Sequence, residues 1–441
     1  MKRSGRQAAQ RKASSGRQPT ASTVEKRSVQ ALAPRYMQEF RCVGSACVES
    51  CCSSWHIAVD EATFRRYQTI RIEPLAGMLR QHVRRHEDPA AAHGAFASIA
   101  LKTDESCPML DAERLCSIQK SLGAEALSGT CNDYPRVFVH DGKRLGLCAS
   151  LSCPEAARLA LSEPSALDMV ELSLEFNALQ APALHRQRDA LLSAQEPDLV
   201  RRHAPVLASV MEALLRLDGL SAEQAMVYGG LIWRRVAALG DQPIAQSEPA
   251  LEQLLDHFLR PESLLRAAEL VQGLPVPKEA QFGLLLAAGQ RFMREVGGRA
   301  SFRALMDEVS QGLHLGHTLE HCQSRYREAD EQVLQPFLAQ HPHLLKNYVL
   351  NGLQASLFPR QGMAELQQEF MELAVRLALT RFYLVGLAAH RGSRFSVADV
   401  VRTVYGVARN IEHNRRFLPG VMQALEAHGA LRLEVLATLL L

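Results

Sequence analysis

The sequence has no uninterrupted apolar run long enough to cross a lipid bilayer. Its longest candidate, FMELAVRLALTRFYLVGLAAHR, contains Glu372, Arg376 and Arg381, so every window of membrane-spanning length includes charge. The N-terminus is basic but lacks the apolar core of a secretory signal peptide. We therefore expect no membrane span, and we expect the protein to be cytoplasmic.

The sequence also lacks the usual cradle for a nucleotide, because no strand is followed by a turn with G-x-G-x-x-G spacing. An excess of basic over acidic residues is confined to the N-terminus: residues 1–36 carry a net charge of +8, whereas the remainder carries −5. Since nucleic-acid-binding domains are usually basic, the acidic body argues against a nucleic-acid-binding protein, and only the tail could bind one. The tail is polar and poor in apolar residues, which predicts disorder over residues 1–34.

The rest of the chain divides by composition. Residues 35–160 are rich in Cys, Pro and Gly, and the short apolar stretches WHIAVD and RVFVH predict small strands or irregular loops. Residues 161–441 show helical periodicity. We expect a mainly α fold, in which a cysteine-rich, loop-rich, cluster-binding segment packs on a C-terminal all-α array.

Two apolar patterns show the helical spacing best. One comprises Leu251, Leu254, Leu255, Phe258 and Leu259, and the other Phe370, Leu373, Ala374, Leu377, Ala378 and Phe382. Ser247 and Pro249 indicate a helix start before the first pattern. Gly312, Pro359 and residues 391–393 indicate breaks between helices.

Nine of the ten cysteines lie between Cys42 and Cys153. In a reducing compartment disulfides are rare, and thiolates gathered by a fold are the ligands that soft or borderline metals prefer. Buried apolar packing is the alternative, and it suits Cys148 and Cys322 better than the others. The segment therefore predicts a metal or iron–sulfur centre.

The spacing of these cysteines narrows the type of centre. C-x4-C-x3-CC is not the C-x2-C knuckle of zinc fingers. Cys47 and Cys51 could begin the C-x3-C-x2-C triplet of radical enzymes, but its third position is Ser54. We favour a [4Fe–4S] cluster over zinc, because there are more thiols than one tetrahedral zinc needs and few histidines.

A second group of possible ligands is His314, His317 and His321, next to Cys322. The spacing would place the three imidazoles on one face of a helix, where they could hold a metal. Gly312 and Gly316 weaken the prediction of a helix, and a solvent-facing polar surface is the commoner meaning of such a pattern.

Several longer strings resemble the flagellin lysine-N-methylases. They are FRCVGSACVESCCSSWHIAVD, CPMLDAERLCSIQKSLGAEALSGTCNDYPRVF and SLSCPEAARL, with LLKNYVLNGLQASLFP in the helical part. The order CC, CP-x-L-D, C-x-x-Y-P-R, S-C-P-E and N-Y-x-x-N is a specific combination, and it extends over residues 37–360. The basic tail and Cys148 lie outside it.

The resemblance implies methyl transfer from S-adenosylmethionine to lysine ε-amines of flagellin, beside an iron–sulfur cluster. It implies a pool of cluster ligands made of Cys42, Cys47, Cys51, Cys52, Cys107, Cys116, Cys131 and Cys153. Methylating an amine is a polar displacement that needs no radical, so we expect the cluster to be structural. The residues do not identify a catalytic base or a methyl-donor site.

Such a reaction needs a neutral lysine, and apolar or aromatic walls would lower the pKa of the amine. The candidates for these walls are Trp55, Tyr134, Tyr348 and Tyr383. The alternative function is a non-catalytic iron- or zinc-binding module for metal delivery or redox sensing, in which the helices would bind a partner.

Overall fold

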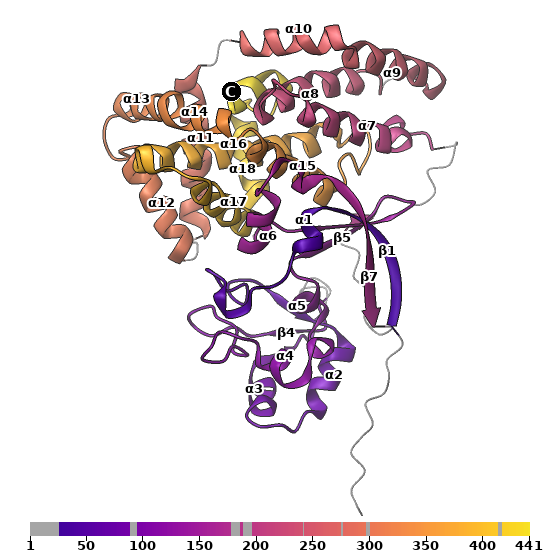
Figure 1. Ribbon diagram of the computed structural model, residues 1–441, viewed down its shortest axis with the longest axis vertical. Coiled ribbons are helices and arrows are strands. Elements are labelled where there is room, and N and C mark those ends of the chain that lie inside the picture. The colour runs from indigo at the N-terminus through magenta and orange to yellow at the C-terminus, as the bar shows by residue number, and fades with distance from the viewer. Residues whose placement is uncertain are drawn as a thin grey trace, which may run out of the picture.

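The computed structural model describes residues 26–88, 95–177, 186–187, 196–240, 242–274, 277–296, 300–412 and 417–441. Figure 1 shows a large helical body above a smaller lobe built from the cysteine-rich segment, with a long two-stranded ribbon beside the junction. The mainly α fold with an N-terminal strand and loop region is therefore confirmed. In the described parts of the chain, no helix has both the length and the apolar character needed to cross a membrane.

The ribbon is made by β1 (Lys26–Pro34) and β7 (Met169–Asn177), which pair antiparallel along their whole length. They form one side of a five-stranded sheet with the order β7-β1-β6-β5-β8. Its other strands are β5 (Arg136–His140), β6 (Leu145–Ala149) and β8 (Arg186–Gln187).

This sheet corrects two expectations. The predicted disordered tail reached residue 34, but residues 26–34 form β1; residues 1–25 lie outside the described residues. The high charge of the N-terminus concealed a short apolar segment, in which Ala31 and Ala33 are buried. Likewise, β7 and β8 interrupt the part of the chain that we expected to be all-α.

The smaller lobe has its own sheet, with the order β2-β4-β3, and its own buried apolar cluster that includes Ile57, Leu79 and Met109. WHIAVD forms β2 as predicted, whereas RVFVH forms β5 of the larger sheet. The elements of the lobe are β2 (Ile57–Val59), α2 (Glu61–Thr69), α3 (Leu75–His82), β3 (Val83–Arg85), β4 (Ala97–Ile99), α4 (Ser117–Leu122), η2 (Ala124–Ala126) and α5 (Gly129–Asp133).

Most of the remaining elements pack around one extended apolar core with α16 at its centre. Between β1 and β7 in the sequence lie α1 (Tyr36–Glu39), η1 (Gly44–Ala46), α6 (Pro154–Ala160) and η3 (Pro164–Leu167). The body then comprises α7 (Leu199–Arg216), α8 (Ala222–Ala237), α9 (Ile244–Leu259), α10 (Pro261–Gln272), α11 (Lys278–Val296), α12 (Ala300–Gly312), α13 (Leu319–Ala329), η4 (Asp330–Leu334), α14 (Gln335–Gln340), α15 (His343–Ser356), α16 (Leu366–Arg391), η5 (Gly392–Arg394), α17 (Val397–Glu412), α18 (Phe417–Ala427), η6 (Leu433–Val435) and α19 (Leu436–Leu440).

Both predicted helical patterns lie in helices, α9 and α16, and the predicted breaks fall at helix ends. The start of α9 was predicted wrongly. The helix begins at Ile244, and both Ser247 and Pro249 lie inside it. The Ser247 hydroxyl donates to the carbonyl oxygen of Pro243 at 3.1 Å and does not cap the helix.

Helix α15 is fastened to the sheet by the two asparagines of its N-Y-x-x-N segment. Asn351 accepts a hydrogen bond from the Tyr36 hydroxyl at 2.8 Å and donates to the carbonyl oxygen of Ala149 at 3.0 Å. Asn347 donates to the carbonyl oxygens of Ala160 and Glu163. Because both asparagines are buried, these bonds fix the position of α15 against β6 and α6.

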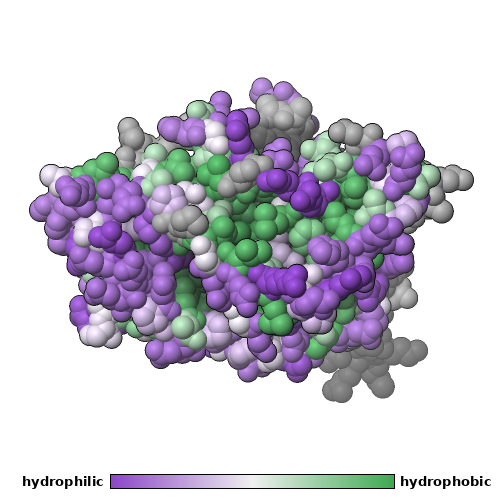
Figure 2. All heavy atoms as spheres, turned by 90° about the horizontal axis from the view of Figure 1, so that it is seen from above, coloured by the Kyte–Doolittle hydropathy of each residue, from purple (hydrophilic) through white to green (hydrophobic). Residues whose placement is uncertain are grey.

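Figure 2 views the helical end of the molecule, where apolar residues appear between charged ones. Leu265 and Leu270 of α10 are 69% and 71% exposed there. The cavity described below receives no lining residue from α7 to α10, so this face does not contribute to the candidate site.

Candidate functional site

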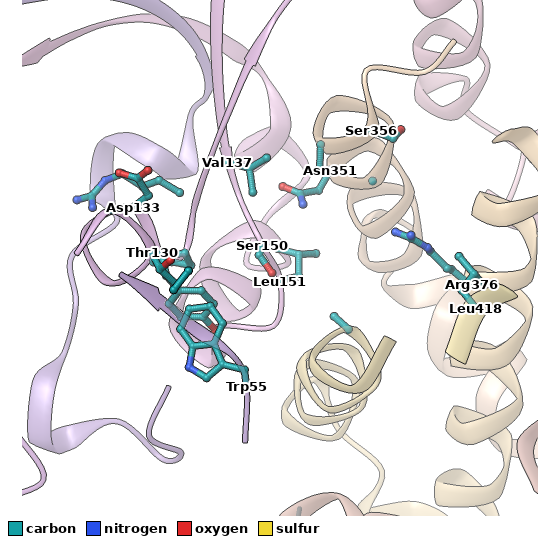
Figure 3. Close-up of a pocket in the computed structure, with 18 of the residues that line it drawn as sticks. Trp55, Thr130, Asp133, Val137, Ser150, Leu151, Asn351, Ser356, Arg376 and Leu418 are labelled. Atoms are coloured by element: carbon teal, nitrogen blue, oxygen red, sulfur yellow. The ribbon is translucent and has the colours of Figure 1, made fainter. Parts of the chain in front are cut away.

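A cavity of about 840 Å³ lies between the small lobe and the helical body. Its size falls in the range of sites that bind small molecules and cofactors. Figure 3 shows lining side chains converging on it from both sides. They include Trp55, Asp60, Glu61, Phe96, Thr130, Asp133, Tyr134, Arg136, Ser150, Tyr348, Asn351, Ser356, Glu372, Arg376 and Leu418.

The wall on the lobe side is built by the C-x-x-Y-P-R motif. Helix α5 carries Thr130 and Asp133, and Tyr134 follows it directly. The Tyr134 ring lies 5.1 Å from that of Trp55, centroid to centroid, and its hydroxyl lies 3.1 Å from the Ser152 hydroxyl. Ser152 belongs to the S-C-P-E motif, so this contact joins two of the motifs that carry the family resemblance.

The opposite wall is formed mainly by α15 and α16. Tyr348 of α15 lies between the two anchoring asparagines in the sequence and lines the cavity. Its hydroxyl accepts a hydrogen bond from Thr380 of α16 at 3.2 Å. Glu372 and Arg376 lie one turn apart on α16, and both line the cavity. In Figure 3, Arg376 extends from its helix toward the side of the cavity where Asn351 lies.

The cavity therefore has aromatic and charged walls. Trp55, Tyr134 and Tyr348 line it, as a lysine channel would require. Tyr383, the fourth aromatic candidate, does not: it is buried in α16 against Phe302. Burial raises the pKa of both Tyr134 and Tyr383, so both hydroxyls stay neutral at physiological pH.

Acidic side chains gather on the lobe side of the cavity. Asp60 caps α2 by accepting hydrogen bonds from the backbone and hydroxyl of Thr63 at 2.8 and 2.7 Å. Burial favours its neutral form, but these hydrogen bonds lower the pKa of Asp60 below its usual value. Glu61 pairs with Arg65, and Asp133 is buried. An ionised Asp60 would attract a cationic group to this wall.

The eight predicted cluster ligands lie near one another beside this cavity. Cys131, on α5, packs with Cys52, Cys107 and Cys116 against the core of the small lobe. Cys51 lies 4.0 Å from Cys52, sulfur to sulfur. Cys42 and Cys47 belong to the loop before this pair, and Cys153 belongs to the core of the helical body.

The cysteines lie close enough for their thiolate forms to repel one another, and this repulsion contributes to raising the pKa of several of them. Burial, with a smaller contribution from Cys107, Cys116 and Cys51, raises the pKa of Cys131 to about 12. Burial and repulsion from Cys47 and Cys51 raise the pKa of Cys153 to about 11, although backbone hydrogen bonds act in the opposite direction.

The other thiols show the same effect. Burial, opposed by a backbone hydrogen bond and reinforced by Cys116 and Cys51, raises the pKa of Cys107 to about 11. Burial raises the pKa of Cys47, and Cys51 and Cys42 add to this increase. The hydrogen bond with Cys51 and burial raise the pKa of Cys52.

Several contacts fold the cysteine loops into place. The backbone N–H of Cys107 donates to the carbonyl oxygen of Cys52 at 2.8 Å. Asp111 of the CP-x-L-D motif accepts from the backbone N–H of Leu115 and pairs with Lys120. Arg409 of α17 donates to the carbonyl oxygen of Ser50 at 2.5 Å, so the helical body also holds the cysteine loop.

Thiols of this number and kind are suitable ligands for an iron–sulfur cluster or zinc. Their arrangement is looser than a formed site: nowhere in the described ranges do three His, Cys, Asp or Glu side chains have the arrangement of a metal site. Cys148 and Cys322 lie outside the pool. Cys148 is buried in β6, and Cys322 donates to the carbonyl oxygen of His314 at 3.2 Å.

The three histidines do lie together, but not on one helical face as predicted. Their ring centroids are 5.0, 5.2 and 5.5 Å apart, and Nδ1 of His314 lies 2.8 Å from Nε2 of His321. A turn produces the arrangement, because α13 begins only at Leu319 and His314 and Gly316 have positive φ angles.

Two residues of the cavity have a significance that the sequence did not reveal. In the sequence, Arg376 is a charge that interrupts an apolar run, and Asp133 is part of the C-x-x-Y-P-R motif. The sequence does offer one indication for Arg376. It lies in a strongly apolar helical stretch, α16, and charged residues are rarely found there unless they have a partner or a function. No pattern in the sequence indicates that Arg376 and Asp133 line the same cavity.

The fold and the site together describe a helical protein with a cysteine-rich lobe that closes one side of a cofactor-sized cavity. Residues 209–439 match the family model of the FliB lysine N-methylase C-terminal domain. This match covers more than half of the chain, and the protein belongs to the FliB lysine N-methylase family.

The relatives of the chain agree with this family. The lysine-N-methylase of Salmonella typhimurium is 23% identical over 387 residues, which cover 86% of this chain and 91% of the relative. The flagellar biosynthetic protein FliU of Salmonella muenchen is 31% identical over 138 residues, which cover 31% of this chain and 80% of the relative. No solved structure matches the chain.

Proposed function

We propose that this protein transfers methyl groups from S-adenosylmethionine to lysine ε-amines of flagellin, and that its eight-cysteine pool holds a structural [4Fe–4S] cluster. The cavity carries the proposal. Two segments that resemble the flagellin lysine-N-methylases, residues 130–136 and helix α15, line its opposite walls. The names of the relatives, a lysine-N-methylase and a flagellar biosynthetic protein, support the reaction and the substrate.

Methyl transfer of this kind is a polar displacement. The lysine must first lose its proton, so that the nitrogen lone pair can attack the methyl carbon. A C–N bond then forms as the C–S bond breaks, and its electron pair neutralises the sulfonium. The products are a methylated ammonium and the neutral thioether S-adenosylhomocysteine. The protein's task is to hold nitrogen, carbon and sulfur in line.

The walls of the cavity suit these two reactants. Faces of Trp55, Tyr134 and Tyr348 can stabilise the sulfonium and the lysine ammonium through cation–π contacts. The same rings exclude water, which lowers the pKa of the incoming amine. Asp60 and Asp133 on the lobe side would attract cationic groups into the cavity.

The eight cysteines of the pool support the second part of the proposal, a structural cluster beside this cavity. Cys42, Cys47, Cys51, Cys52, Cys107, Cys116, Cys131 and Cys153 would supply the ligands. A cluster held there would cross-link loops that have little regular structure, as structural metals do in small domains. Cys131 and Trp55 both pack on the lobe core, so such a brace would also fix the wall of the cavity.

Methylation of purified flagellin tests the proposal. We expect transfer of labelled methyl from S-adenosylmethionine to flagellin by the iron-loaded protein, and no transfer to flagellin whose lysines have been acetylated. Iron content and the absorption spectrum are measured on the same sample under anaerobic conditions. Bound iron without methylation would contradict the enzyme and favour the metal-delivery or redox-sensing module.

A further inference from the structure

One cation that lines the cavity has no side-chain partner among the described residues. The Nε atom of Arg376 is buried, and in the described part of the chain it makes no hydrogen bond. The ion pairs found among the described residues do not include Arg376, and its side chain has no further interaction there. This arginine nevertheless lines a cavity of about 840 Å³ and extends into it (Figure 3).

The other arginines of α16 show that this helix normally pairs its cations. Arg381 contacts Glu223 at 3.1 Å and Asp330 at 2.6 Å. Arg391 contacts Glu308 at 2.9 Å and Asp399 at 3.3 Å. Glu372 lies one turn before Arg376, yet it accepts a hydrogen bond from the side chain of Gln368, at 3.4 Å. Arg376 is thus the exception among the three.

A guanidinium N–H that loses water without gaining a partner is unfavourable for folding, and the Nε–H of Arg376 is in this position. The planar fork of a guanidinium matches the two oxygens of a carboxylate, which can accept parallel hydrogen bonds from it. The position of Arg376 therefore fits a carboxylate that arrives with a ligand. The acidic groups Asp60 and Asp133 lie on the lobe side, so the cavity also offers places for the cationic part of that ligand.

We propose that Arg376 binds the α-carboxylate of the methyl donor. This inference rests on the proposed methyl transfer. S-Adenosylmethionine carries a carboxylate beside an ammonium and a sulfonium. This distribution of charge matches a cavity lined by several acids and by Arg376, whose buried Nε–H has no partner among the described residues. The cavity has the size of a cofactor site. An acidic residue of flagellin is the other source of a carboxylate, and the test separates the two.

The test compares two donors that differ only in this group, S-adenosylmethionine and its decarboxylated analogue. Binding of each to the full-length, iron-loaded protein is measured by calorimetry. We expect wild type to bind S-adenosylmethionine about tenfold to a hundredfold more tightly than the analogue, as a charge-assisted hydrogen bond would give. Arg376→Met should bind both with the lower affinity, and Arg376→Lys should retain part of the difference.

Arg394→Met is the matched control, because Arg394 is exposed and does not line the cavity. It should keep the full preference of wild type. Circular dichroism and iron content confirm that each variant is folded. If Arg376→Met does not fold, the comparison of the two donors on wild type and on Arg376→Lys still tests the inference.

Three results would overturn the inference. Wild type could bind both donors equally, Arg376→Met could keep the preference, or Arg376→Met could raise only the KM for flagellin, which would assign the arginine to the protein substrate. In each case methylation by wild type would still support the proposed function. Failure of wild type both to bind S-adenosylmethionine and to methylate flagellin would instead refute the proposed function itself.

Discussion

At the scale of single residues, the asparagines of α15 hold one wall of the cavity in place, and Asn351 also lines that wall. Asn351 lies 3% exposed and satisfies both the Tyr36 hydroxyl and the carbonyl oxygen of Ala149. The Tyr36 hydroxyl in turn accepts from the backbone N–H of Ala149 at 2.8 Å. This closed set of bonds holds α15, and with it Tyr348, against the sheet.

Asn351→Ala should therefore lower the free energy of unfolding by about 2–3 kcal/mol, because two buried polar groups lose a partner. Urea denaturation measures the loss. Tyr36→Phe is the companion variant, and the double variant should cost less than the sum of the two, since both remove the same bond. Strictly additive costs would contradict the shared network.

Trp55 acts on the other wall, where it packs against Tyr134. Trp55→Ala should lower kcat/KM for flagellin methylation by about tenfold or more, because an aromatic face for the cationic reactants is lost. Trp55→Phe keeps a ring and should retain most of the activity. Both variants should keep their iron. Equal activity of Trp55→Ala and wild type would remove this side chain from the proposed channel.

At the scale of elements, buried charges join helices that are far apart in sequence. Arg381 of α16 contacts Asp330 of η4 and Glu223 of α8, and Lys278 of α11 contacts Asp330 at 2.8 Å. Lys278 also donates to the carbonyl oxygen of Leu441. The last residue of the chain is thereby tied to the centre of the helical body.

Removing the acid from this group should be costly. Asp330→Asn leaves Arg381 and Lys278 buried with less opposing charge, and we expect a loss of about 3–5 kcal/mol in the free energy of unfolding at pH 7. Asp256→Asn is the control: its pair with Arg260 is exposed, and its loss should cost less than about 1 kcal/mol.

The cost should depend on pH in a definite direction. Burial opposes ionisation of Asp330, but Arg381 and Lys278 outweigh it and lower the pKa of Asp330 below its ordinary value of 3.8. Such a group stabilises the fold above that ordinary value, and the contribution is lost as the pH falls through the lower, folded pKa. The difference between wild type and Asp330→Asn should therefore shrink below about pH 4.

The elements differ in how well the sequence predicted them. The periodic apolar residues of α9 and α16 were sufficient to predict both helices, because a buried helical face leaves a local pattern. Strand β1 could not be predicted, since its partner β7 lies far along the chain and its nine residues follow a basic tail. The cavity depends on contacts of the same kind: Trp55 and Tyr348 come together only through tertiary packing.

At the scale of the whole molecule, the cysteine pool lies across the junction between the lobe and the helical body. Cys107 belongs to the core of the lobe, and Cys153 belongs to the core of the body. Arg409 of the body also contacts Glu49 in the cysteine loop, at 3.4 Å. A cluster with ligands from both sides would fix the lobe on the body and hold the two walls of the cavity in a fixed relative position.

The double variant Cys51→Ser, Cys52→Ser tests this role, because these neighbours lie at the centre of the pool. It should lose iron and unfold at a lower temperature, by roughly 2–3 °C for a loss of about 2–3 kcal/mol in a chain of this length. Proteolysis should first cut the small lobe. Cys322→Ser is the control, since Cys322 lies outside the pool and serine can also donate to His314. A variant without iron but with an unchanged melting temperature would show that the cluster does not brace the fold.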